Sequence, residues 1–375
     1  MKMNIRKLFF WFHLIIGCSA ALFIFLMSIT GVGLTYERQL IQAAQRTDYP
    51  TVIGQDETRL ALDHIIDIAK TYETTKSPSI SFSKESNAPF VIKDGRKILA
   101  YINPFTGNKM SAPGYETTQF LSKLRAFHRW LTLDGKFSEV GRWVNGIANV
   151  IFFLLAISGL YLWLPAKLKK RSFKQKLILT KNHQNSQARD YQWHNTFGFY
   201  MTPILIVVIF TAFFFSFKWP SDTLKTYVST QAKSLPKATT LKKEDVVLHL
   251  AMQTLFEKSV QPNTNWQTIS FLLPKVPQSI QTFQVDMGNG GEPQKRKNVI
   301  MDTISGDLIT EQSFDDYSTY RKIRSYIRFL HTGEVYGLLG QTLAGIASLL
   351  ACLLVYTGIA MSLRRWQRSR GKVTN

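Results

Sequence analysis

Cysteines and acidic residues are both scarce in this 375-residue chain. Its two cysteines, Cys18 and Cys352, are too few for a disulfide-rich secreted scaffold or a zinc site built from thiolates. Asp and Glu number 25 against 46 Lys and Arg, which gives a net charge of +21. A P-loop and hydrolase signatures are also missing. The glycine-rich stretch Gly288–Gly291 lacks the spacing of a nucleotide-binding motif. These absences disfavour a soluble nicotinamide enzyme and a hydrolase.

Charged residues are absent from four long stretches of 22 to 29 residues. The stretches are Leu8–Leu34, Trp143–Leu164, Trp193–Phe217 and Val335–Leu363. About 20 apolar residues in a helix span the hydrocarbon core of a bilayer, and a bare backbone cannot remain unpaired there. The sequence therefore predicts four transmembrane helices. A cleaved signal peptide is the alternative for the first stretch, but its apolar run continues well past Cys18, which favours a spanning helix.

The distribution of Lys and Arg predicts how these helices are oriented. Residues 1–7, 165–192 and 364–375 together carry a net charge of +15, whereas 35–142 and 218–334 carry +3 each. Cytoplasmic loops are enriched in Lys and Arg. We therefore expect both termini and the middle loop in the cytoplasm and the two long segments outside. The positive charge follows from this topology, so no nucleic-acid partner is expected.

Two residue spacings occur twice, in the same order, in the two halves of the chain. The spacing H-x3-G-x12-T is formed by His13, Gly17 and Thr30 and again by His194, Gly198 and Thr211. The spacing G-x4-G-x12-G is formed by Gly141, Gly146 and Gly159 and again by Gly340, Gly345 and Gly358. Each long segment also begins with an amphipathic helix, over 57–73 and 243–257, followed by short strands. These patterns predict two parallel repeats, each with a small external α+β domain.

Several motifs make the whole chain resemble the PepSY-associated transmembrane proteins. These motifs are GRW, SGLYLW, WHNTFG and FLHTGE beside the spans, and NPFTG and DTISG in the long segments. The last two stand at the place of the Asp-x-x-Thr-Gly turn of PepSY domains. Members of this size resemble ferric-siderophore reductases of the bacterial inner membrane that carry two haem b groups. The resemblance implies that activity, that membrane and a ferric siderophore as the substrate.

The predicted fold is a membrane α-helical protein with four transmembrane helices in two parallel repeats and two external PepSY-like α+β domains. Its expected parts are transmembrane helix 1 (8–34), external domain 1 (35–127), a periplasmic-side helix with transmembrane helix 2 (128–164), a cytoplasmic basic loop (165–192), transmembrane helix 3 (193–217), external domain 2 (218–326), transmembrane helix 4 (327–363) and a cytoplasmic tail (364–375).

Four of the seven histidines lie at the ends of the predicted spans. His13 and His194 are at the cytoplasmic ends, and His128 and His331 lie just outside the membrane. Imidazole is a common axial ligand of haem iron, and parallel repeats place equivalent residues opposite each other at equal depth. We expect His13 to pair with His194 and His128 with His331, so that two haem irons form a path for electrons. The other histidines, His64, His183 and His249, are expected to be ordinary surface residues.

Other residues near these histidines have two interpretations each. Gly17, Gly198, Gly146 and Gly345 would let a flat macrocycle approach the backbone, or would serve helix packing. Arg125, Arg129, Arg142, Arg324 and Arg328 would pair with haem propionates, or would extend toward the membrane surface. Glu334 and Tyr336 are candidate neighbours of His331 near an external acceptor.

The sequence thus predicts a di-haem oxidoreductase that passes electrons to a ferric siderophore or another periplasmic acceptor. No cytoplasmic segment is large enough to bind a nicotinamide or flavin, so the donor would be a quinol or a separate protein. Two alternatives stay open: a non-enzymatic PepSY membrane protein that binds a peptide or protease, and a cytochrome that serves a different acceptor.

Overall fold

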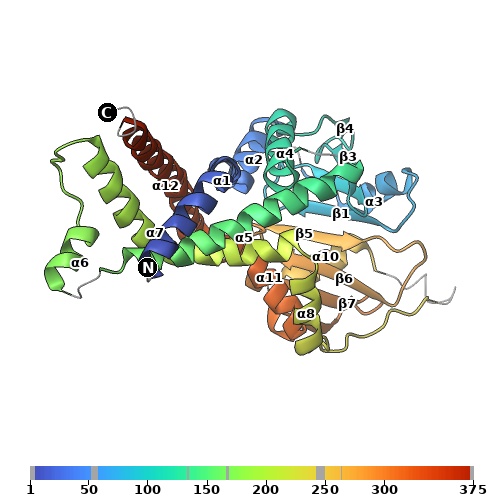
Figure 1. Cartoon of the computed structure of the whole chain (residues 1–375). Coiled ribbons are helices and arrows are strands. Elements are labelled where there is room, and N and C mark those ends of the chain that lie inside the picture. The colour runs from blue at the N-terminus through green and yellow to red at the C-terminus, as the bar shows by residue number, and fades with distance from the viewer. Residues whose placement is uncertain are drawn as a thin grey trace. The chain divides into compact units, whose positions relative to one another are not determined.

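The computed structural model describes residues 5–51, 58–132, 135–165, 169–241, 250–262 and 264–371. The chain divides into two compact units, each assembled from separate parts of the sequence. The helical unit comprises Met1–Glu37, Gln119–Tyr227 and Tyr326–Asn375, and the sheet unit comprises Arg38–Thr118 and Val228–Ser325. Figure 1 shows the elements of both units.

Four helices of the helical unit are long and apolar enough to cross a membrane. They are α1 (Ile5–Leu34), α5 (Ser138–Trp163), α7 (Ser186–Ser216) and α12 (Gly337–Gly371). Each covers most of one charge-free stretch, in agreement with the four predicted spans. All four helices extend beyond the charge-free stretches, and α7 and α12 extend furthest. Helix α7 starts at Ser186, where the Asn185 side chain accepts the Ala188 N–H at 2.9 Å, and α12 continues to Gly371.

The long helices pack so that α1 and α7 each contact both α5 and α12. Two repeated glycines allow close contact at one end of these packed pairs. A Cβ atom on Gly146 would lie 2.7 Å from the Phe217 ring, and one on Gly345 would lie 2.8 Å from Thr35. Of the two roles left open for these two glycines, the structure favours helix packing.

Shorter helices precede and connect the long ones. They are α4 (Tyr115–Trp130), α6 (Lys170–Leu177), α8 (Trp219–Tyr227) and α11 (Thr319–His331). The chain turns back sharply from α4 into α5 and from α11 into α12. A Cβ on Gly141 would lie 2.0 Å from the Trp130 carbonyl oxygen, and one on Gly340 would lie 2.2 Å from the Gly333 carbonyl oxygen. Only glycine permits these two approaches, which set where α4 and α11 end.

The strands of the sheet unit form one antiparallel sheet in the order β4-β3-β2-β1-β5-β6-β7-β8. The strands are β1 (Pro78–Ser83), β2 (Phe90–Asp94), β3 (Lys97–Ile102), β4 (Lys109–Met110), β5 (Thr268–Leu272), β6 (Ile280–Asp286), β7 (Arg296–Asp302) and β8 (Leu308–Gln312).

The two long segments therefore share one sheet, although the sequence predicts a separate α+β domain for each. Strand β1 of the first segment pairs with β5 of the second, from Ser79 opposite Leu272 to Ser83 opposite Thr268. The reason is that each four-stranded half would otherwise expose an unpaired strand edge, and joining the two edges satisfies both rows of backbone groups.

Helices α3 (Leu62–Lys70) and α10 (Met252–Val260) cover one face of the sheet (Figure 1). The core between them is aliphatic and aromatic, as the alternation of buried residues along β1, β5 and β6 requires. The second expected helix, over 243–257, is seen only in part, because residues 242–249 lie outside the described residues. A further helix of the first segment, α2 (Glu37–Thr47), leads from the end of α1 into the sheet unit.

Candidate functional site

His13 and His194 lie opposite each other inside the helical unit. His13 is on α1 and His194 on α7, with their ring centres 6.4 Å apart and the ring planes at 87°. Both rings line a cavity of about 900 Å³ whose walls come from all four long helices. The structure thus brings together the two histidines that the repeat predicts to pair.

His128 and His331 form a second pair with the same separation. His128 lies in the last turn of α4 and His331 is the last residue of α11, with ring centres 6.4 Å apart and planes at 57°. Burial lowers the pKa of His128 to about 4, and the neighbouring His331 adds to this shift. Burial also lowers the pKa of His331. Both rings are therefore neutral at physiological pH and keep a nitrogen lone pair for a metal.

All four rings are hydrogen-bonded through Nδ1 to a hydroxyl on a neighbouring helix. The four contacts are His13 with Ser158 at 2.9 Å, His194 with Thr357 at 2.9 Å, His128 with Thr30 at 2.8 Å and His331 with Thr211 at 3.2 Å. Thr30 and Thr211 are the last residues of the repeated H-x3-G-x12-T spacing, and Ser158 and Thr357 each precede the last glycine of the other spacing. Each pair is thus supported by two hydroxyls that occupy matching sequence positions.

The protons in these contacts can be assigned from the partners of the hydroxyls. Each hydroxyl also lies 2.6 to 2.8 Å from the carbonyl oxygen four residues earlier in its own helix. A hydroxyl has one proton and a carbonyl can only accept, so the hydroxyl donates to the carbonyl and Nδ1–H donates to the hydroxyl. At His331 the Val208 carbonyl oxygen, 3.0 Å from Nδ1, requires the same proton position.

This tautomer leaves Nε2 of each ring with a free lone pair. Among the described residues no hydrogen-bond partner of any of the four Nε2 atoms is found. An Nε2–H would be left without an acceptor in this apolar setting, which is unfavourable, whereas a lone pair is what a metal ligand requires. Each pair can therefore supply two nitrogen ligands.

Glycines leave open space beside the His13 and His194 rings. A Cβ on Gly159 of α5 would lie 3.3 Å from His13 Cε1, and a Cβ on Gly358 of α12 would lie 3.5 Å from His194 Cε1. Two further glycines line the same cavity, Gly17 and Gly198. A flat ligand at this pair would thus meet little side-chain bulk.

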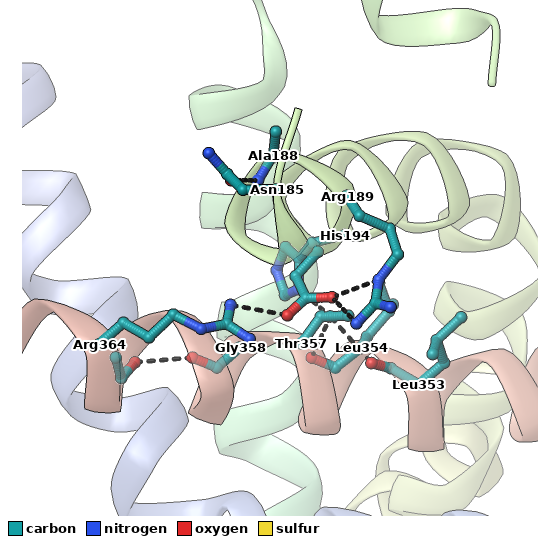
Figure 2. Close-up of polar contacts among 11 residues, drawn as sticks. Asn185, Ala188, Arg189, His194, Leu353, Leu354, Thr357, Gly358 and Arg364 are labelled. Carbon is teal, nitrogen blue, oxygen red and sulfur yellow. Dashed lines mark hydrogen bonds and ion pairs between the residues drawn. The ribbon is translucent and has the colours of Figure 1, made fainter. Parts of the chain in front are cut away.

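A buried carboxylate lies one helical turn before His194. The side chain of Asp190 is fully buried and forms ion pairs with Arg189 at 3.0 Å and with Arg364 of α12 at 2.7 Å. Figure 2 shows these contacts beside the hydrogen bond of His194 to Thr357. Two guanidinium groups offset the cost of burying one carboxylate, and the cluster ties the start of α7 to α12.

The arginines considered for propionate binding have protein partners. Arg125 pairs with Glu37, Arg142 with Glu139, and Arg129 and Arg328 stack on Trp130 and Phe329, while Arg324 contacts the Tyr320 hydroxyl. Three other arginines line the cavity of His13 and His194: Arg6, Arg365 and Arg368. That cavity therefore has a cationic margin that suits an anionic group.

The remaining residues singled out from the sequence do not join the histidine pairs. His64 is on α3, His183 lies between α6 and α7, and His249 is outside the described residues. Glu334 is buried and accepts the Thr332 hydroxyl at 2.9 Å, whereas the Tyr336 side chain is exposed. Within the described ranges, no cluster of three or more His, Cys, Asp and Glu residues could hold a metal ion alone.

Sequence reasoning missed Ser158, Thr357, Gly159, Gly358 and Asp190 as members of the site. A signal was present for four of them, because both halves place a hydroxyl residue and then glycine at matching positions in the returning helices. Asp190 carried no such signal, because the first half has no matching acid near His13.

Comparison with family models of known proteins gives a match over most of the chain. The family model described as the PepSY-associated TM region matches residues 10–365. No curated protein matches the chain. The family match covers both histidine pairs and the strands that lie between the long helices in sequence.

Proposed function

Since the chain belongs to the PepSY-associated transmembrane family, we propose that it is a di-haem oxidoreductase that passes electrons across the bacterial inner membrane. The acceptor proposed here is a ferric siderophore on the periplasmic side.

The observation that carries the proposal is the equal separation within the two histidine pairs. Metal–imidazole bonds of about 2.0–2.1 Å place two opposed nitrogens roughly 4 Å apart, and adding about 1.1 Å from each nitrogen to its ring centre gives about 6.3 Å between centres. The ring centres are 6.4 Å apart in both pairs. Together with four free Nε2 lone pairs, this distance fits one metal ion, and hence one haem, at each pair.

Each residue of the pairs has a defined role in this proposal. His13 and His194 hold one haem, and His128 and His331 hold the other. Their hydroxyl partners keep Nδ1 protonated and fix the orientation of each ring. Bound haem iron would cycle between Fe(III) and Fe(II) and so carry one electron at a time.

The same residues support a parallel arrangement of two repeats. Both pairs join a residue of the first half to its sequence match or near match in the second half, and the hydroxyl contacts match as well. With Lys and Arg concentrated at residues 1–7, 165–192 and 364–375, the positive-inside tendency favours cytoplasmic termini and a periplasmic sheet unit.

The substrate class rests on the family resemblance. One electron converts a siderophore-bound Fe(III) to Fe(II), which binds hard oxygen ligands more weakly and is released. The electrons would come from a quinol in the membrane or a separate donor protein.

A visible spectrum of the purified protein tests the proposal. We expect reducible haem bands and two haems per chain, and we expect His13→Ala or His128→Ala to remove one haem and leave the other. His183→Ala is the matched control and should keep both. A wild-type protein without haem bands would favour the non-enzymatic alternative, and loss of both haems from either variant would disprove the pairing.

A further inference from the structure

The sheet has a polar face opposite its apolar core, and this face is hollow at the seam between the two halves. Along the paired strands β1 and β5, Phe82 and Ile269 point into the core. The intervening residues point to the other face, and small serines lie at the middle of the pairing, where Ser81 is directly opposite Ser270. Small hydroxyl residues at the middle of an eight-stranded sheet leave a depression in its surface.

A cleft of about 720 Å³ lies over this depression, and all of its lining residues belong to the sheet unit. We call it the seam cleft. Besides the serines, its lining includes Arg38, Gln42, Arg46 and Tyr49, which lie on or just after α2, and Lys93 of β2 and Tyr101 of β3. Four cationic side chains line the cleft, against two acidic ones.

Several hydrogen-bond donors in the seam cleft have no hydrogen-bond partner among the described residues. The two acidic residues are already used, because Glu85 pairs with Arg46 and Asp286 pairs with Arg296. In the part of the chain that the structure describes, neither the Lys93 ammonium group nor the hydroxyls of Tyr49 and Tyr101 have a hydrogen-bond partner. All three side chains are half-buried rather than extended into solvent.

The chemistry of these donors indicates what would bind. Burial raises the pKa of both tyrosines, so their phenols remain protonated donors at neutral pH. An ammonium group, two phenols and several serine hydroxyls, with the acids already paired, require a ligand rich in acceptor oxygens and negative charge. A half-buried cation without a partner is unfavourable until such a ligand arrives.

We infer that the seam cleft binds a small anionic, oxygen-rich ligand through Lys93, Tyr49 and Tyr101. Under the proposed function, on which this part of the inference rests, that ligand is the electron acceptor, an anionic ferric chelate held by carboxylate or catecholate oxygens. A cationic or neutral chelate is disfavoured by the same charges.

Titration calorimetry on the full-length purified protein tests this inference. The probe is gallium(III)–citrate, an anionic and redox-inert analogue of a ferric chelate, so binding is measured apart from reduction. Lys93→Gln is expected to weaken its binding about tenfold or more, as for the loss of a charged hydrogen bond. Ser81→Leu, which fills the hollow, is expected to abolish binding.

Matched controls lie on the same sheet. One control is Lys97→Gln, which changes an exposed side chain of β3 outside the cleft. The other is Thr282→Leu, on the polar face of β6 but also outside the cleft. Both are expected to change binding less than twofold. The gallium complex of desferrioxamine B, which is cationic, is expected to bind more weakly than gallium–citrate. An unchanged far-ultraviolet circular dichroism spectrum and melting temperature show that each variant is folded.

The outcomes separate this inference from the proposed function. No binding of gallium–citrate, or binding that neither Lys93→Gln nor Ser81→Leu weakens, overturns the inference even if both haems are present. Equal affinity for citrate without metal overturns the acceptor role. Binding that depends on Lys93 in a protein that contains no haem supports the anion site and overturns the proposed function.

Discussion

The hydroxyl partners of His128 and His331 allow a paired comparison, because each ring contacts one hydroxyl and one backbone carbonyl group at matching positions. Thr30→Val removes the hydroxyl that lies 2.8 Å from His128 Nδ1 and leaves the ring with the backbone carbonyl group of Met27. Thr211→Val leaves His331 Nδ1 with the Val208 carbonyl oxygen at 3.0 Å. Since both rings would bind the same haem, each variant serves as a reference for the other.

The expected effect is a rise in the midpoint potential of that haem. A hydrogen bond from Nδ1–H makes imidazole a stronger electron donor, which favours Fe(III), so its loss favours Fe(II). The loss of a hydrogen bond worth about 0.5–1.5 kcal/mol corresponds to a shift of about 20–65 mV in a one-electron potential, because a tenfold change in the equilibrium constant corresponds to about 59 mV. We expect both variants to raise the potential by an amount near the low end of this range, because a carbonyl group remains beside each ring. Thr30→Val removes the shorter contact, 2.8 Å against 3.2 Å, and is expected to give the larger shift.

Spectroelectrochemical titration resolves the two haems and measures both potentials. Thr30→Ser keeps the hydroxyl and is expected to restore the wild-type value, and the haem of His13 and His194 is expected to stay unchanged in all three variants. A fall in the potential of either valine variant, or no rescue by Thr30→Ser, would refute the assignment of the protons.

Three further predictions concern other parts of the chain. Gly159→Leu places a side chain against His13 and is expected to lower haem content at that pair alone, as measured by haem per protein and the remaining spectrum. Asp190→Asn removes a buried carboxylate from between two partly exposed guanidinium groups, so we expect a loss of about 1.5–3 kcal/mol in stability and a lower melting temperature. Backbone N–H groups donate to the Asp302 carboxylate in its turn and lower its pKa. The ionised carboxylate therefore stabilises the folded state at pH values above the ordinary Asp pKa, and this stabilisation is lost as the pH falls through the lowered pKa. The destabilisation by Asp302→Ala should therefore shrink in acid, whereas that by Asn103→Ala, in the matching uncharged turn, should not depend on this titration.

The histidine pairing shows what could be predicted from the repeated residue spacing alone. The spacing of His13 and His194 within matching sequences was enough to expect them opposite each other, and the structure places their ring centres 6.4 Å apart. The hydroxyl partners were out of reach, because a serine in an apolar helix has no sequence signal that tells which way it faces. Ser158 contacts His13 because α5 packs on α1 with this side of the helix facing the ring, which the sequence alone does not show.

The sheet shows the same limit for strands. The sequence was sufficient to predict short strands after each amphipathic helix, but not that β1 would pair with β5 of a distant segment. Strand edges pair through backbone groups that every residue carries, so the sequence holds little information on the choice of partner.

The four spans could be predicted from the lack of charge in long apolar stretches. The free-energy cost of placing a charged side chain in lipid depends mainly on that residue and not on its tertiary contacts. The free Nε2 atoms, the glycine-lined cavity and the seam cleft depend on contacts between helices and strands far apart in the chain. Such contacts exist only once several elements have packed, so they could be known only from the folded molecule.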